Sequence, residues 1–83
     1  VPGILGGSDK RAREYLEKSI ELSPNETLNY LFLARLLKDS FDDPAAAGAI
    51  ARRGLAVPAD KLERIESIEA VEDLKKFVGS STP

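Results

Sequence analysis

The sequence contains no cysteine and no histidine. Without cysteine it can form neither a disulfide nor a thiolate nucleophile, and without histidine it lacks the usual side chain for acid–base catalysis and for zinc or copper ligation. No apolar run approaches the length of about 18 residues that indicates a membrane-spanning helix, and no secretory signal is present. We therefore expect no cofactor, no metal site and no membrane insertion.

Methionine is absent too, even at position 1, which predicts that the chain is processed or belongs to a longer protein. Lysine and arginine number 12 and aspartate and glutamate 14, so the net charge is only −2. That balance favours neither nucleic acid nor an anionic membrane surface as a partner. With 83 residues, of which 42% are hydrophobic, the composition is typical of one small soluble domain spanning residues 1–83. Both a cytoplasmic and a bacterial periplasmic location stay open.

Residues 8–22 form the first predicted helix. The preceding segment 1–7 is apolar and interrupted by glycine and proline, so we expect a lead-in there, with Ser8 as the helix cap and Asp9 in the first turn. Apolar or small residues then recur with helical spacing along one face. They are Ala12, Tyr15, Leu16, Ser19, Ile20 and Leu22.

A second helix is predicted over residues 26–39. Ser23 and Glu26 have the spacing of a capping box, with Pro24 at the first helical position. The stretch "LNYLFLARLL" is apolar on nearly every side, so this helix must be covered by more than one neighbour. We expect it to form the centre of the domain.

A third helix is predicted over residues 44–56, capped by Asp43 and rich in alanine and glycine. A fourth helical stretch follows at 61–78, and residues 79–83 form a frayed tail. Apolar residues recur every three positions along the fourth stretch, so its stripe winds around the helix. The helix therefore either changes partner along its length or breaks near Ser67.

Two residue types recur after 34 positions, which gives two pairs. They are Ala12 and Ala46, and Pro24 and Pro58. A period of 34 in helical hairpins is typical of tetratricopeptide repeats. The predicted second helix also carries an aromatic, apolar, small and apolar series with that family's spacing, namely Tyr30, Leu33, Ala34 and Leu37. From about residue 7 to residue 58 the chain therefore resembles the tetratricopeptide repeat family. Its lead-in "PGILGG" is also similar to a group of bacterial proteins of that family.

The resemblance implies an all-α fold of antiparallel helical hairpins, a fragment of an α-solenoid. In this interpretation residues 8–22 are the second helix of a partial repeat, residues 26–56 are one full repeat, and residues 61–78 are a capping helix. Arg53 stands where the period requires a small residue. A shift of one residue would place Gly54 and Ala47 at the small positions instead.

The resemblance also implies a groove lined by the first helix of each hairpin. The corresponding residues are Leu28, Leu31, Arg35, Lys38 and Asp39. Arg35 and Lys38 are three residues apart and can hold a carboxylate of a partner peptide, or they can simply be solvated charges. Family members that bind chaperone tails use a groove asparagine where Arg35 stands, so their carboxylate clamp is not transferred to this chain.

The expected function is a non-catalytic scaffold for binding a protein or peptide, because no catalytic motif is present. Three alternatives stay open. The piece can be an architectural C-terminal cap of a larger solenoid, it can self-associate through an uncovered first helix, or it can belong to an exported substrate-binding protein. The uncovered helix is expected because the first helix should bury one flank, near Leu16 and Ile20, against the second helix. A repeat that starts with its second helix leaves the other flank without a partner.

Overall fold

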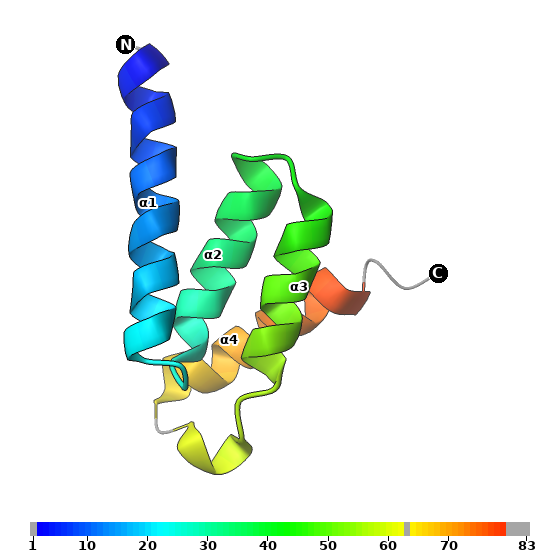
Figure 1. The fold of residues 1–83 in the computed structure, drawn as a ribbon. Coiled ribbons are helices and arrows are strands. Elements are labelled where there is room, and N and C mark those ends of the chain that lie inside the picture. Colours follow the sequence, from blue (N-terminus) through cyan, green and yellow to red (C-terminus); the bar gives the residue numbers. More distant parts are fainter. Residues whose placement is uncertain (1, 63, 80–83) are drawn as a thin grey trace.

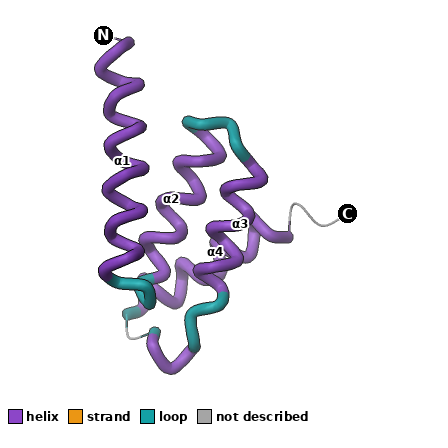
Figure 2. The backbone as a smooth tube through the Cα atoms, viewed as in Figure 1, coloured by secondary structure: helices purple, strands orange, loops and turns teal. Residues whose placement is uncertain are grey.

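A computed structural model of the protein describes residues 2–62 and 64–79, and every regular element in that part of the chain is helical (Figures 1 and 2). The elements are α1 (Pro2–Leu22), α2 (Thr27–Asp39), α3 (Pro44–Leu55), a 3₁₀ turn η1 (Ala59–Lys61) and α4 (Ile65–Gly79). The predicted all-α class is confirmed. Of the predicted tail, residues 80–83 lie outside the described residues, and Gly79 ends α4. None of the described helices is both long enough and apolar enough to cross a membrane.

The start of the first helix differs from the prediction. Helix α1 begins at Pro2, so residues 2–7 are helical rather than a lead-in, and Ser8 lies inside the helix instead of capping it. Pro2 occupies the first turn, where its missing N–H has no intrahelical partner to lose. Each internal glycine weakens a helix by about 1 kcal/mol without forbidding it. Glycine and proline were therefore misleading as signs of a helix boundary here.

The cap of α2 is also a correction. The segment 23–26 forms a turn, and the N-cap is Glu26 rather than Ser23. The Glu26 carboxylate accepts a hydrogen bond from the Leu28 N–H at 3.3 Å, as an N-cap side chain does. Pro24 lies outside the helix, and its carbonyl accepts a hydrogen bond from the Tyr30 hydroxyl at 2.7 Å. Two hydrogen bonds, one at Glu26 and one at Pro24, thus join this turn to α2.

The start of α3 follows the prediction. Asp43 is the N-cap, and its carboxylate accepts a hydrogen bond from the Ala46 N–H at 3.1 Å. Pro44 takes the first helical position, which again removes no intrahelical bond. The helix ends at Leu55, one residue before the expected boundary.

Helix α2 is the centre of the fold, as its apolar sequence predicts, because α1, α3 and α4 all pack against it. Five of its residues belong to the buried core, which α1, α3 and α4 complete. The core residues are Ile20, Tyr30, Leu31, Leu33, Ala34, Leu37, Ala47, Ala51, Ala70 and Leu74. Phe32 is the exception on α2, with 47% of its surface exposed.

Helix α4 packs against both α2 and α3. It is continuous through Ser67, and the interruption in the fourth stretch precedes Ile65. The three-residue spacing of Asp60 and Glu63 in the sequence predicts a further capping box, but Glu63 lies outside the described residues.

Ser67 is buried in the first turn of α4, where it accepts one hydrogen bond and donates another. The Thr27 hydroxyl donates to its carbonyl at 2.7 Å, and its own hydroxyl donates to the Glu26 carboxylate at 2.7 Å. Ser67 therefore fastens the first turn of α4 to the start of α2.

The small face of α3 follows the shifted register. Gly54 and Ala47 are buried, whereas Arg53 is exposed, with its guanidinium 5.7 Å from the centre of the Tyr30 ring. A Cβ added at Gly54 would lie 2.7 Å from Leu74 Cδ1 and 2.8 Å from Tyr30 Cβ. Gly54 therefore lets three helices approach one another closely.

The two glycines of α3 should respond to alanine in opposite directions. At Gly48 an added Cβ meets no atom within 4 Å, so Gly48→Ala should stabilise the protein by about 0.5–1 kcal/mol through helix propensity alone. Gly54→Ala gains the same propensity but overpacks the contact with Tyr30 and Leu74, at a cost of about 1–3 kcal/mol. For Gly54→Ala we therefore expect the free energy of unfolding to fall by about 1 kcal/mol. Thermal and urea unfolding of the two variants checks this, and a stabilising Gly54→Ala would contradict the close contact.

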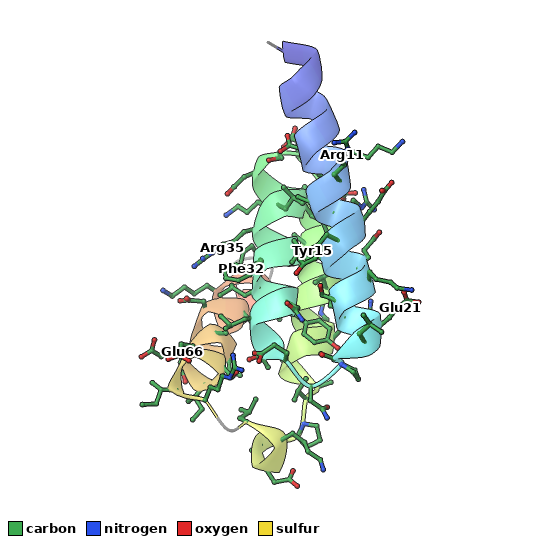
Figure 3. All side chains as sticks on the ribbon, turned by 90° about the vertical axis from the view of Figure 1, so that its left-hand side faces the viewer. Arg11, Tyr15, Glu21, Phe32, Arg35 and Glu66 are labelled. Atoms are coloured by element: carbon green, nitrogen blue, oxygen red, sulfur yellow. The ribbon has the colours of Figure 1, made fainter. Side chains whose placement is uncertain are left out.

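Helix α1 is the least covered of the four α-helices. Among the described elements it packs only against α2, and its N-terminal part rises beyond the loop between α2 and α3 (Figure 1). Ile20 is buried and Leu16 packs partly against the core, so the flank near them is covered by α2. The neighbouring flank is not, since Tyr15 is 71% and Leu22 74% exposed. Figure 3 looks onto this side of the molecule and shows Tyr15 on α1 and Phe32 on α2.

Candidate functional site

The structure separates the five residues of the predicted groove into three groups. Leu31 is 3% exposed and Leu28 packs against the core, so both serve the packing of α2. Asp39 is exposed at the end of α2 but does not line the cleft described below. Only Arg35 and Lys38 are placed to meet a ligand.

Arg35 and Lys38 line a shallow cleft of about 210 Å³ between α2 and α4. Its other wall consists of Asp73, Lys76 and Phe77, all from α4. The packing of α4 on α2 creates this cleft, because the two helices contribute one wall each.

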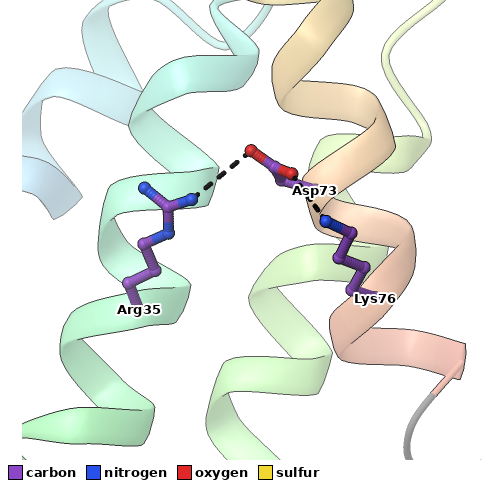
Figure 4. Close-up of polar contacts among 3 residues, drawn as sticks. All are labelled: Arg35, Asp73 and Lys76. Carbon is purple, nitrogen blue, oxygen red and sulfur yellow. Dashed lines mark hydrogen bonds and ion pairs between the residues drawn. The ribbon is translucent and has the colours of Figure 1, made fainter.

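Asp73 lies between two of the cations of the cleft (Figure 4). One of its carboxylate oxygens is 3.4 Å from the Arg35 guanidinium, and the other is 3.4 Å from Lys76 Nζ. These pairs are open to solvent, since the side chains of Arg35 and Lys76 are 51% and 79% exposed. Exposed ion pairs of this kind contribute only about 0–1 kcal/mol to stability. They orient the side chains without fixing them.

Lys38 has a different partner. Its ammonium group lies 5.7 Å from the centre of the Phe77 ring, within the range of a cation–π contact. The cleft therefore combines three cations, one carboxylate and one aromatic ring. Because the cations outnumber the carboxylate, the lining has a net positive charge, although the whole protein is slightly negative. An anionic group with an apolar neighbour is the ligand that such a lining attracts.

Sequence reasoning missed the α4 wall of the cleft. Lys76 and Phe77 stand three and four residues after Asp73, so both lie on the same side of the helix as Asp73. That spacing was a visible signal. It gave no indication that this face meets Arg35, because the contact joins segments 38 residues apart.

Two further hollows lie elsewhere on the surface. One, of about 230 Å³, is polar and adjoins the hydrogen bonds of Ser67, and the other, of about 370 Å³, lies between α1 and α3 beside Ile20 and Arg53. Neither gathers cations around a ring as the α2–α4 cleft does. In the part of the chain that the structure describes, no group of three or more carboxylates lies together in a way that would hold a metal ion.

Comparison of the chain with protein-family models, with curated proteins and with solved structures finds no match.

Proposed function

We propose that this protein is a non-catalytic module that binds protein or peptide partners, built from helical hairpins of the tetratricopeptide type. The burial of the motif residues supports this proposal. Tyr30, Leu33, Ala34 and Leu37 are each less than 5% exposed, as expected for positions that hold two antiparallel helices together. Helix α4 contacts both helices of the α2–α3 hairpin, which is how one unit of a stacked array meets the next.

The ligand proposed for this module is an acidic peptide segment, bound in the α2–α4 cleft through a carboxylate. The observation that carries the proposal is the grouping of Arg35, Lys38 and Lys76 around Phe77, with Asp73 as the one carboxylate among the lining residues. Arg35 offers a planar pair of N–H donors that suits a carboxylate, and Lys38 adds a second charge one helical turn away. Phe77 offers an apolar surface for a neighbouring side chain of the peptide.

Reversing both charges on α2, with Arg35→Glu and Lys38→Glu together, should abolish binding of an acidic peptide. The probe is a short synthetic peptide with two acidic residues before a free C-terminal carboxylate, and fluorescence anisotropy measures its binding. Binding of the parent protein should weaken as salt is added, because the site is exposed and charge-dependent. Folding should be preserved, since both side chains are solvent-exposed.

The matched control reverses two exposed cations outside the cleft, with Lys10→Glu and Arg52→Glu together. Both double variants change the net charge equally, so a general electrostatic effect would weaken them equally. The proposal requires the control to bind like the parent protein. It is wrong if the two double variants bind the peptide equally, or if the parent protein does not bind it.

A second candidate function is architectural, with α4 closing the end of a helical array. The specific observation in its favour is the firm attachment of α4. Leu74 is completely buried, and the hydrogen bonds of Ser67 join its first turn to Thr27 and Glu26. A parent protein that binds no acidic peptide, although α4 is stably attached, would favour this candidate.

A further inference from the structure

Four exposed residues form one stripe along α1. Arg11, Tyr15, Lys18 and Leu22 are spaced four, three and four residues apart, so they share a single helix face. We call them the α1 stripe. Cations and apolar side chains alternate along it. Among the residues whose burial the structure describes, Tyr15 and Leu22 are the two most exposed large apolar ones. Over its 11 residue steps the α1 stripe is about 16 Å long.

The outer face of α4 carries a stripe of the opposite charge. The stripe begins at Ile65, and three further residues follow it by three, four and seven positions, namely Ile68, Glu69 and Glu72. All four are exposed and share one helix face. We call them the α4 stripe. It covers about 10 Å of helix, which fits within the length of the α1 stripe. Ser67, Ala70 and Leu74 turn inward from the same helix, so the α4 stripe is left for an external contact.

We propose that the α4 stripe of one copy of this protein docks on the α1 stripe of another copy. With the two helices antiparallel, Ile65 and Ile68 would meet Leu22, and Glu69 would then lie opposite Lys18. The carboxylates Glu69 and Glu72 would meet the cations of the α1 stripe. Glu72 lies 3.4 Å from Lys75 Nζ within its own helix, but that pair is largely exposed and holds the carboxylate only weakly.

Charge decides between this contact and a pairing of α1 with α1. A two-fold contact between two α1 stripes would bring Arg11 and Lys18 from both copies into one interface, with four cations and no carboxylate from the stripes. The α4 stripe supplies the carboxylates that this arrangement lacks. Because the two docking faces differ, the contact is heterologous, and repeated contacts produce open chains or rings rather than a closed dimer.

Sedimentation equilibrium over a concentration series tests the proposal with two charge-reversed variants. One carries Arg11→Glu and Lys18→Glu, and the other carries Glu69→Lys and Glu72→Lys. The average mass of the parent protein should rise with concentration and pass beyond that of a dimer. Each variant alone should stay at the monomer mass, because its own two stripes then carry charges of the same sign.

An equimolar mixture of the two variants should associate again, since each stripe finds an opposite charge on the other variant. Circular dichroism of each variant shows whether the helices are intact, and an unfolded variant is replaced by the single reversals Lys18→Glu and Glu69→Lys. The proposal is wrong if the parent protein is monomeric throughout, if the α4 variant associates like the parent, or if the mixture stays monomeric. None of these variants alters Arg35 or Lys38, so peptide binding in the cleft is tested separately.

Discussion

Replacing Leu74 by alanine should lower the free energy of unfolding by about 2–5 kcal/mol, which is the usual range for removing a fully buried leucine side chain. Leu74 has no exposed surface, and it lies where α4 meets Gly54 of α3 and Tyr30 of α2. The loss includes the transfer of the removed atoms and the cavity that they leave. For a domain of this size that is a large part of the total stability. Urea unfolding followed by circular dichroism measures it.

Leu22→Ala is the matched control, because it makes the same chemical change at a site that is 74% exposed. Its free energy of unfolding should stay within about 0.5 kcal/mol of the parent value when measured at low protein concentration. Similar losses for both variants would mean that Leu74 is not part of the core. The Leu74→Ala background should also reduce the cost of Gly54→Ala, since it removes the nearest atom that the added methyl group meets.

Local signals in the sequence predict the interior of this fold well. The apolar stretch of α2 requires several neighbours, and three helices do cover it. The Asp43–Pro44 pair starts α3 where the capping rules place it. These two predictions succeed because each depends on residues that are close together in the chain, whereas the caps predicted at Ser8 and Ser23 are wrong.

The fourth helix shows what the hydrophobic pattern of a sequence cannot predict. The large apolar residues recur every three positions and include Ile65 and Ile68, which are exposed. The face that packs inward instead contains Ser67 and Ala70 together with Leu74. A serine is buried there because Thr27 and Glu26, about 40 residues away, satisfy its polar groups. Hydrophobicity alone cannot identify such a face.

Only the α2 wall of the candidate cleft can be predicted from the sequence, because the α4 wall also depends on contacts between distant segments. Arg35 and Lys38 can be found from their spacing on the apolar second helix. Asp73 and Phe77 become partners only when α4 has been placed, and its placement involves contacts between distant segments, among them the long-range bonds of Ser67. Leu28 and Leu31 share the helix with the two cations, but α2 uses them for packing.

Enlarging Ala34 to leucine should destabilise the protein by about 1–3 kcal/mol. Ala34 is completely buried on α2, the helix against which the other α-helices pack. In the proposed alignment with the tetratricopeptide motif it takes the small position. Leucine would have to displace packed side chains or force the helices apart, whereas the two residues differ little in helix propensity. The expected result is a lower melting temperature, measured by circular dichroism.

Ala49→Leu is the control for this substitution, because Ala49 lies on the exposed face of α3 and the same atoms would be added into solvent. Its melting temperature should stay close to that of the parent protein. If Ala34→Leu melts at the parent temperature as well, the close helix contact at Ala34 does not exist, and the alignment with the tetratricopeptide motif fails with it. If only Ala34→Leu loses stability, a small residue is required at this position for the reason that the motif implies, which is the close approach of antiparallel helices.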